Sequence, residues 1–315
     1  MKSRILSILL VVALLVTVAV FSVQADAPLT KDAADAIIAD VTNNLDTNTD
    51  FDATSNAGTV SAVCPYCGGE AKDWEPLPVL STNASYSTDK HFYVPAQADN
   101  GEFTTAGRYL LSTEGKTICI YLNGQTINDS ISDTAAFMVT KGTLNFLGSG
   151  TVKAVASPGA NKAGARGVLD VSGSAAGSTI NVFGGTFEST GTAPTVTIRN
   201  QYTSAVNVYD GTIGSTAQTV ETVRFIGGSN KSNGTFNLFD GTVNAGTGKS
   251  AIEFSTVKTY IANGAEVNIS GGTINSGNVT GGGINLNVAA TVNMSGGTIT
   301  NSIATTGNGV NVYIN

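Results

Sequence analysis

The chain of 315 residues contains a single histidine, His91, and it lies outside the repeated part of the sequence described below. No imidazole is therefore available on a repeat to act as a general acid or base. The sequence also lacks a Gly-x-Ser-x-Gly nucleophile motif and a phosphate-binding glycine loop. These absences argue against serine hydrolase chemistry and against nucleotide binding.

Charged residues are scarce, and two of the basic ones, Lys2 and Arg4, stand at the N-terminus before an apolar run over residues 5–23. This pattern, followed by the small-residue site Ala25-Asp26-Ala27, predicts a signal peptide over residues 1–27. An uncleaved membrane anchor is the alternative, because the run is nearly long enough to span a bilayer. No cysteine is near the cleavage site, so no lipid anchor is predicted.

Removing Lys2 and Arg4 from the 16 basic residues leaves 14 against 23 acidic ones, a formal charge of −9. An acidic chain is poorly suited to bind nucleic acid or an anionic membrane surface. Together with the signal peptide, the charge predicts an exported protein with neither nucleic acid nor, after cleavage of the signal peptide, a membrane as its partner.

One octapeptide recurs through the second half of the chain, with apolar residues at its first, third and eighth positions and Gly-Gly-Thr or Asp-Gly-Thr near its end. It occurs at residues 180–187, 206–213, 236–243, 267–274 and 292–299, with a looser copy at 144–152. The spacing of 25 to 31 residues between the five regular copies predicts one structural unit that is stacked on itself.

Alternation within the octapeptide places Ile180 and Val182 inward and Asn181 and Phe183 outward. A second short strand recurs at the same period, with its first apolar residue at positions 196, 223, 252, 284 and 310. Two short strands per repeat with no helical segment between them predict an all-β fold, a parallel β-helix of about seven coils over residues 109–315.

The repeats resemble the coils of the pectin-lyase-like right-handed β-helix superfamily. The layout, from a signal peptide through Cys-x-x-Cys-Gly-Gly to Gly-Gly-Thr coils, is similar to exported β-helix proteins of anaerobic bacteria. This resemblance implies a protein that is secreted or displayed on a bacterial cell surface, with an extracellular polysaccharide or surface protein as its partner. Hydrolases of that superfamily carry Asn-Thr-Asp, Asp-Asp, Gly-His-Gly and Arg-Ile-Lys signatures on consecutive coils. Only Asn48-Thr49-Asp50 matches here, before the coils begin, so the resemblance implies a fold more than a function.

Two segments precede the repeats. In residues 28–60, the apolar residues Ala33, Ile37, Val41 and Leu45 are spaced by four, which predicts a short amphipathic helix. Such a helix could cover the hydrophobic end coil of the β-helix, whereas the alternative is a mobile linker. Residues 61–108 contain several prolines and are predicted to be irregular.

The motif Cys64-Pro-Tyr-Cys67-Gly-Gly resembles the knuckle of zinc ribbons and rubredoxins, in which a tight turn directs two sulfur atoms at one metal ion. A tetrahedral site would have to recruit Cys119 or His91, which the sequence does not show to be near. The alternative is a local disulfide or a pair of free thiols, because export favours oxidation and three cysteines leave one unpaired.

Calcium is a second metal to consider. The alternating oxygen side chains of residues 46–52 match the start of a calcium loop, but Phe51 replaces its glycine and Ala57 its bidentate glutamate. Asp210 and Asp240 occupy the same turn position on successive coils. They could hold calcium or act as an acid and base pair, although Asp-Gly is also a favourable turn.

Two columns of outward side chains follow from stacking the octapeptides. The asparagine column, at positions 181, 207, 237, 268 and 293, is explained by amides that hydrogen-bond along the stack. The aromatic column of Phe183, Tyr209 and Phe239 is our candidate ligand-binding site. These rings could stack on sugars, stabilise the coil, or be covered by the N-terminal segment or a partner chain.

The preferred hypothesis is an exported, non-catalytic surface or adhesin-like module that binds carbohydrate or protein on an outer face. The rival is a lyase or hydrolase acting on acidic, pectic polysaccharide, with Asp210, Asp240, Arg224 and Glu253 as its catalytic residues. Arg224 and Glu253 are predicted to be neighbours on adjacent coils, where a surface ion pair is the simpler interpretation. A third alternative is a purely structural spacer.

The chain ends inside a second strand, at Val310-Asn-Val-Tyr-Ile-Asn315. An uncapped strand exposes unpaired backbone groups, so we expect either a longer gene product or an end that another molecule covers.

Overall fold

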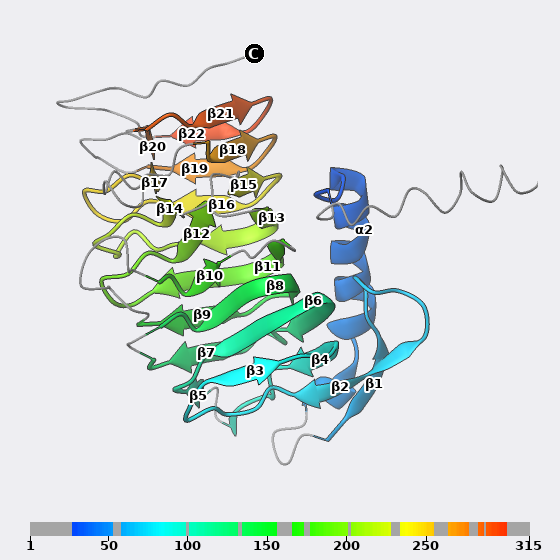
Figure 1. The fold of residues 1–315 in the computed structure, drawn as a ribbon. Coiled ribbons are helices and arrows are strands. Elements are labelled where there is room, and N and C mark those ends of the chain that lie inside the picture. The colour runs from blue at the N-terminus through cyan, green and yellow to red at the C-terminus, as the bar shows by residue number, and fades with distance from the viewer. Residues whose placement is uncertain are drawn as a thin grey trace, which may run out of the picture.

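The computed structural model of the protein is a parallel β-solenoid of about six turns, close to the seven coils that the repeat predicts (Figure 1). It describes residues 27–52, 58–98, 101–131, 134–155, 166–172, 177–200, 203–227, 234–254, 264–276, 283–286 and 288–300. Residues 1–26 of the predicted signal peptide and the predicted strand at 309–312 lie outside these residues.

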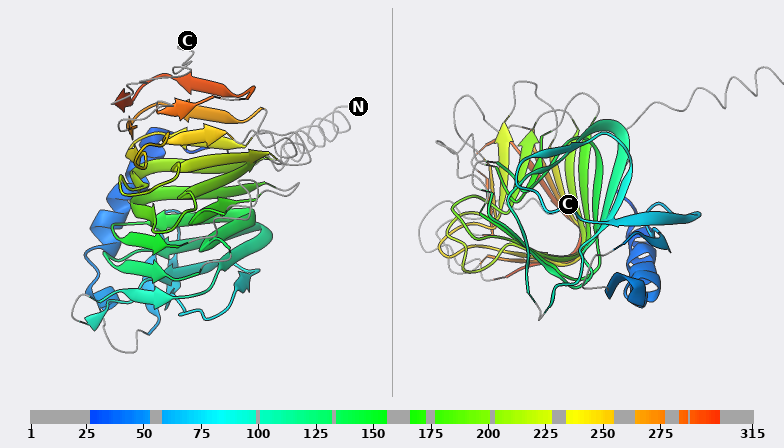
Figure 2. Two further views of the ribbon diagram at one scale, coloured as in Figure 1. Left: turned by 90° about the vertical axis from the view of Figure 1, so that its left-hand side faces the viewer. Right: turned by 90° about the horizontal axis from the view of Figure 1, so that it is seen from below.

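Each regular coil has three strands, which build three faces of the solenoid (Figure 2). Face 1 consists of β4 (Lys90–Tyr93), the second half of β6 (Tyr109–Tyr121), the second half of β8 (Phe137–Leu147), the first half of β11 (Ser178–Ser189), the first half of β13 (Ser204–Ile213), β15 (Thr235–Leu238), β18 (Glu266–Ile269) and β21 (Thr291–Met294).

Face 2 consists of β5 (Phe103–Thr105), β7 (Thr126–Asp129), β9 (Thr151–Ala154), the ends of β11 and β13, β16 (Thr242–Asn244), β19 (Thr273–Asn275) and β22 (Thr298–Thr300). Face 3 consists of β3 (Ala84–Tyr86), the starts of β6 and β8, β10 (Leu169–Val171), β12 (Val196–Asn200), β14 (Val223–Gly227), β17 (Ile252–Phe254) and β20 (Ile284–Asn285).

The octapeptide supplies two of these strands rather than the one that we predicted. In β11 its first half lies on face 1, and the chain then turns at Gly184 and Gly185, whose φ angles are 153° and 84°. An added Cβ on Gly185 would meet Leu122 at 2.4 Å, so the corner requires glycine. The short strand from Thr186 to Ser189 then begins face 2.

Every strand of a face pairs in parallel with the equivalent strand of the next coil. The inward positions of face 1 therefore stack Ile180 on Val206, Val206 on Phe236 and Phe236 on Val267. All four side chains are fully buried in an inner core that runs along the solenoid. Burial of this continuous apolar column stabilises the coils, because no coil can bury its inner side chains alone.

The coils begin earlier than the sequence indicates. Residues 61–108, predicted to be irregular, contain β2 (Ala71–Pro76), β3, β4 and β5, and β3, β4 and β5 pair in parallel with β6 and β7. This first coil carries no Gly-Gly-Thr octapeptide, and Pro76, Pro78 and Pro95 interrupt its strands, so the repeat signal is missing although the coil is present.

The predicted N-terminal helix is confirmed as α2 (Lys31–Asp40), which continues into the π-helical turn η1 (Val41–Leu45) and then into the 3-10 turn η2 (Thr49–Asp52). The hydroxyl of Thr30 accepts a hydrogen bond from the Ala33 amide and caps the helix. Asp32 lies in the first turn, where its negative charge interacts favourably with the positive end of the helix dipole. No described helix is long and apolar enough to cross a membrane.

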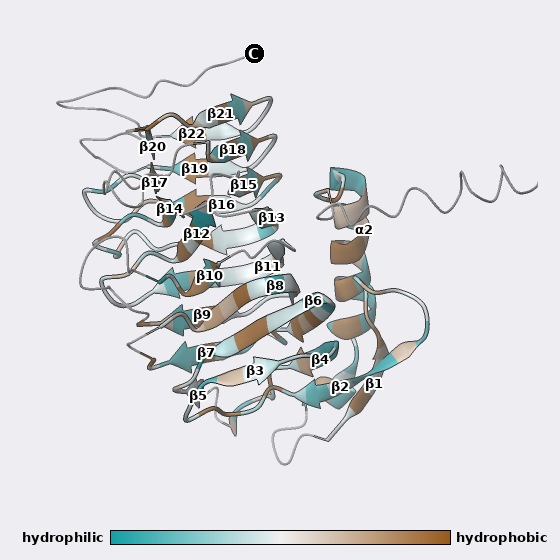
Figure 3. Cartoon of the chain, viewed as in Figure 1, coloured by the Kyte–Doolittle hydropathy of each residue, from teal (hydrophilic) through white to brown (hydrophobic). Residues whose placement is uncertain are grey.

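This segment lies along the side of the solenoid, over face 1, and not over its end as we predicted (Figures 1 and 2). We call residues 27–52 and 58–70 the N-terminal cover. Hydrophobic positions recur along α2 (Figure 3). They face side chains that point outward from face 1, and the contact forms a second, outer core.

Phe51 lies at the centre of the outer core and is fully buried. Its ring meets Tyr93 and Tyr121 edge-on, with centroids 5.1 Å away in both cases. The Tyr121 hydroxyl donates to Asp46 at 2.8 Å. A solenoid face that would otherwise expose aromatic rings is thus sealed by the protein's own N-terminal segment.

Candidate metal centre

The Cys-x-x-Cys motif lies at the turn of a β-hairpin. Strand β1 (Val60–Val63) pairs antiparallel with β2, and the motif connects them. Gly68 and Gly69 adopt positive φ angles of 62° and 75°, and the Gly68 amide donates to the Cys64 carbonyl at 2.8 Å. The Cys67 amide approaches the Cys64 sulfur at 3.4 Å. This turn has the geometry of the predicted knuckle, because it directs both sulfurs to one side.

The hairpin places the knuckle against the outer side of face 1, where His91 of β4 and Cys119 of β6 are direct neighbours in register. The Cys67 sulfur lies 3.4 Å from His91 Nε2 and 3.8 Å from the Cys119 sulfur. The ligand atoms of Cys64, Cys67, His91 and Cys119 all lie within 4.8 Å of one another. The structure therefore brings both proposed additional ligands to the knuckle.

These separations fit a tetrahedral ion. Zinc–sulfur bonds of about 2.3 Å at a tetrahedral angle separate two sulfur ligands by about 3.8 Å, and a sulfur from a nitrogen ligand by about 3.6 Å. The Cys67–Cys119 sulfur distance of 3.8 Å and the distance of 3.4 Å from the Cys67 sulfur to His91 Nε2 are close to these values. Among the described residues, this is the group of cysteine, histidine and acidic side chains that could hold a metal ion.

The three thiols influence one another strongly. The pKa of Cys67 is lowered, first by its contact with the Cys119 thiol, then by Cys64, and also by His91. Burial and the neighbouring sulfurs raise the pKa of Cys119 well above its usual value. Three thiolates at such short distances repel one another, so all three can ionise together only when a cation lies between them.

The centre is mostly closed to solvent. Cys64 and Cys119 are fully buried, His91 is half-buried and Cys67 is exposed. The Trp74 ring packs edge-on against His91 with centroids 5.2 Å apart. The Asn145 side-chain amide approaches the Cys119 sulfur at 3.4 Å. Sequence reasoning missed Asn145, although it lies 26 residues after Cys119, one repeat period along the chain.

The aromatic column predicted as a ligand-binding site lies under the N-terminal cover. The rings of Phe183, Tyr209 and Phe239 stack face to face, with centroids 4.9 Å and 4.7 Å apart and interplanar angles of 10° and 13°. Phe183 and Tyr209 are each 2% exposed. Because the ring faces contact each other, and Phe183 and Tyr209 are buried while Phe239 is partly buried, this geometry favours the alternative of cover by the N-terminal segment over sugar stacking.

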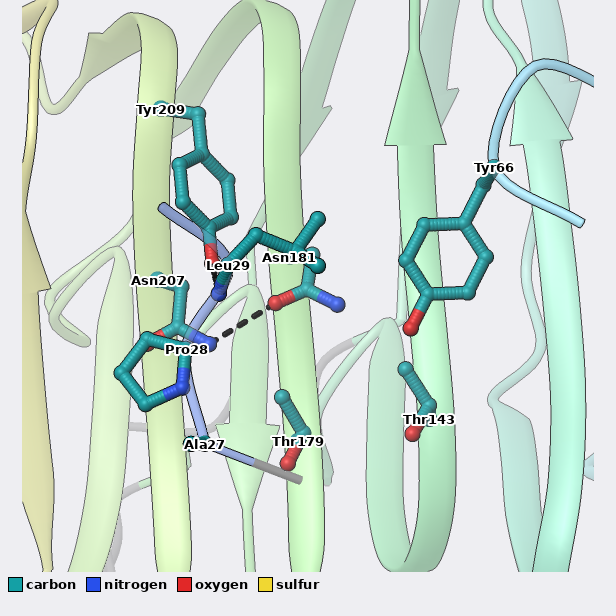
Figure 4. Close-up of a pocket in the computed structure, with 9 residues that line it drawn as sticks. All are labelled: Ala27, Pro28, Leu29, Tyr66, Thr143, Thr179, Asn181, Asn207 and Tyr209. Atoms are coloured by element: carbon teal, nitrogen blue, oxygen red, sulfur yellow. Dashed lines mark hydrogen bonds between the residues drawn. The ribbon is translucent and has the colours of Figure 1, made fainter. Parts of the chain in front are cut away.

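Contacts from the cover fix this column in place. The Tyr66 ring of the knuckle packs against Phe183 at a centroid distance of 5.9 Å. The backbone of Leu29 crosses the asparagine column and donates to the Tyr209 hydroxyl (Figure 4). The asparagine column itself forms the predicted ladder, with amide bonds of 2.6 to 2.9 Å between successive coils.

The residues considered for calcium have other partners. Asp210 and Asp240 each accept a hydrogen bond from the amide of the following glycine, at 2.7 Å and 2.8 Å. Asp240 also pairs with Lys31 of the cover at 3.2 Å. In the segment at 46–52, Asp46 accepts from Tyr121 and Phe51 belongs to the outer core. Through these contacts, the acidic side chains stabilise the turns and the packing of the cover.

The four residues of the enzymatic alternative do not form one site. Asp210 and Asp240 lie at the corner after face 1, whereas Arg224 of β14 and Glu253 of β17 lie on face 3. Arg224 and Glu253 are neighbours in register, as predicted. However, the buried Arg224 guanidinium pairs with Glu221, a carboxylate on the segment just before its own strand.

Comparison with protein-family models, with curated protein sequences and with solved structures returned no match for this chain.

Proposed function

We propose that this protein is an exported, non-catalytic β-helix module in which a structural zinc ion fixes the N-terminal cover to the solenoid. The observation that carries the proposal is the convergence of Cys64, Cys67, His91 and Cys119 within 4.8 Å. The first two belong to the cover and the other two to strands of face 1. A metal ion here would bridge parts of the chain that are otherwise joined mainly by apolar contacts.

The ligand set favours zinc in a structural role. Thiolate and imidazole ligands in tetrahedral geometry are preferred by zinc among the common divalent ions. Four protein ligands complete a tetrahedral shell and leave no position for a water or substrate, which is the arrangement of structural rather than catalytic zinc sites. We therefore assign stability and alignment of the cover to this ion, and no reaction.

Metal analysis of the purified, reduced protein tests this assignment. We expect about one zinc per chain, lost in Cys67→Ser and Cys119→Ser but retained in the control Ser112→Ala, which alters an outward position of the same strand β6. Replacement of zinc by cobalt should give the absorption of tetrahedral thiolate coordination. A protein without zinc whose mass spectrum shows a Cys64–Cys67 disulfide would refute the proposal.

We further propose that the fold belongs with the right-handed, pectin-lyase-like β-helices and serves on the cell surface as a binding module. The separation of Asp210 and Asp240 from Arg224 and Glu253, and the pairing of Arg224 with Glu221, support a non-catalytic role. Pectic substrates with calcium present should release no unsaturated, ultraviolet-absorbing sugars. Steady release of such products would establish the lyase alternative instead.

A partner site is best placed on face 2, away from the cover. A groove of about 530 Å³ lies there between the segments at 188–192 and 215–219, a size within the range of ligand pockets. Its lining is rich in hydroxyl and amide groups and includes Glu188 and Lys153, which suits a neutral or weakly charged carbohydrate.

A glycan array followed by one pair of variants tests this placement. Thr192→Trp fills the groove and should abolish retention of any glycan that the wild type binds. Thr104→Trp adds the same bulk to an exposed position of β5, lower on face 2, and should leave retention unchanged. Equal retention by both variants would place the partner elsewhere, and no retention by the wild type would favour the spacer alternative.

A further inference from the structure

We propose that Asn145 is a positioning residue of the metal centre, and that the asparagine ladder behind it holds the Asn145 amide as a hydrogen-bond donor to the Cys119 thiolate. This inference rests on the proposed zinc site. It assigns to the end of the ladder at Asn181 and Asn145 a role in metal binding, in addition to its role in joining the coils.

The ladder and two of the metal ligands form a single column of the solenoid. Strand pairing places His91 beside Cys119 and Cys119 beside Asn145. The same position on the following coils is occupied by asparagine throughout, at Asn181, Asn207, Asn237, Asn268 and Asn293. Cys119 thus stands where the repeat would otherwise place another asparagine, and the ladder ends on its sulfur.

All amides of the ladder point in one direction. Asn181 donates to Asn145 at 2.8 Å, Asn207 donates to Asn181 at 2.8 Å, and the bonds continue in the same sense up to Asn293. At the lower end, Asn145 Nδ2 lies 3.4 Å from Cys119 Sγ. Hydrogen bonds aligned in this way polarise one another, so the bond from Asn181 strengthens the Asn145 donor nearest the sulfur.

The ladder also fixes which atom of Asn145 faces the sulfur. The Asn145 Oδ1 atom accepts the bond from Asn181, so its amino group must point the other way, toward Cys119. A flipped Asn145 would set two amino groups against each other on one side and an oxygen against the sulfur on the other. A thiolate has no proton to donate and needs a donor, so the ladder and the ligand are complementary.

The charge of the centre makes this donor necessary. Three thiolates and a neutral imidazole around a zinc ion carry a net charge of −1, and Cys119 is fully buried. The Cys64 sulfur receives the Cys67 amide, and the Cys119 sulfur receives Asn145. Residues that hydrogen-bond to metal ligands typically contribute about 10- to 100-fold to metal affinity.

Zinc affinity, measured by competition with a chromophoric chelator on the reduced full chain, tests the inference. Asn145→Leu removes the donor, keeps the branched shape and number of heavy atoms, and should weaken zinc binding about 10- to 100-fold. Asn207→Leu breaks the same ladder two coils away without touching the sulfur and should change zinc affinity by less than about 3-fold. Asn145→Asp and Asn207→Asp form a second, isosteric pair with the same expected order, in case a leucine variant does not fold.

The cobalt-loaded protein gives a readout that a loss of stability alone would not move. Loss of the hydrogen bond makes the Cys119 thiolate a stronger electron donor, so the sulfur-to-cobalt charge-transfer band should shift to lower energy in the Asn145 variants and stay in place in the Asn207 variants. Equal affinities and spectra at both positions would refute the role of Asn145 and leave the proposed metal centre standing. A wild-type protein that binds no zinc would instead refute the proposed metal centre and the inference with it.

Discussion

The hydroxyl group of Tyr209 lies 2.7 Å from the backbone nitrogen of Leu29 and accepts its hydrogen bond. The two residues are 180 positions apart, and this contact ties the start of the cover to the coil that contains β13. Burial raises the pKa of Tyr209 to about 12, so the hydroxyl stays protonated at physiological pH. The bond supplements the apolar contacts of the outer core.

Replacing this hydroxyl should loosen the cover without unfolding the coils. Tyr209→Phe keeps the ring stack but leaves the Leu29 amide unpaired, which costs about 1 kcal/mol. We expect faster hydrogen exchange over residues 27–52. Tyr109→Phe, which removes a 2.6 Å bond to the Pro78 carbonyl far from the cover, should leave that exchange unchanged. Unaltered exchange in Tyr209→Phe would show that the apolar contacts hold the cover alone.

The asparagine ladder should contribute most to stability where it is buried. Asn207→Leu leaves Asn181 Oδ1 without its donor and Asn237 Nδ2 without its acceptor, in positions 4% exposed. Two unpaired buried groups predict a loss of about 2–4 kcal/mol in urea unfolding. Asn293→Leu, at the exposed end of the ladder, should cost less than about 1 kcal/mol. Equal losses at the two positions would contradict this gradient.

Two glycines with similar backbone angles should respond differently to alanine. Gly241 has a φ of 84°, and an added Cβ would lie 2.5 Å from the Gly211 carbonyl oxygen of the coil below. Gly248 has a φ of 69°, and nothing lies within 4 Å of the added atom. Gly248→Ala should cost about 1 kcal/mol from backbone strain alone.

Gly241→Ala should cost about 1–3 kcal/mol more, because two coils must also move apart. Urea unfolding of both variants measures the difference. If the two variants were equally stable, the corner would not be closely packed.

Asp129 should make the protein less stable as the pH rises through weakly acidic values. Burial raises its pKa to about 6, whereas in the unfolded chain an aspartate ionises near pH 4. The folded state therefore holds the proton more tightly, and its advantage is present below about pH 4 and lost as pH rises through about 6. Asp129 Oδ1 accepts from the Ile131 amide at 2.9 Å, and Oδ2 has no partner among the described residues.

Asp129→Asn keeps the acceptor and stays neutral. The difference in unfolding free energy between the variant and the wild type should grow in favour of the variant between about pH 4 and 6 and then stay constant. Urea titrations at several pH values measure it, with Asp89→Asn as a control at an exposed carboxylate. A difference that does not depend on pH would show that Asp129 keeps an ordinary pKa in the fold.

The inner core could be predicted because the octapeptide describes it directly. Ile180, Val206 and Phe236 stand at equivalent positions, and strand pairing stacks them as expected. The third strand was missed because residues such as Thr186 to Ser189 are too few to show an alternation of their own. The first coil was missed because its inward residues, such as Phe92, lie outside the octapeptide pattern.

The metal centre was predictable in its ligand types and not in its assembly. Cys64 and Cys67 have the knuckle spacing, and His91 and Cys119 are the one histidine and the one remaining cysteine of the chain. Their convergence depends on the β1–β2 hairpin folding back over face 1, which is a tertiary contact that no local pattern encodes. The burial of the aromatic column could not be predicted for the same reason, because the burial of Tyr209 depends on a segment 180 residues away.

The cover reaches only part of the solenoid, so the number of coils beyond it can change without altering the covered part. Within the described residues, its hydrogen bonds, ion pair and ring contacts reach Tyr209 on one coil and Asp240 on the next coil, and extend no higher. The strands from β18 onward stack on their neighbours in the solenoid. Coils of that kind can be gained or lost by duplication or deletion of one repeat. Each such event would alter the reach of the molecule by about 4.8 Å, while the covered base with the four residues of the proposed metal centre stays the same.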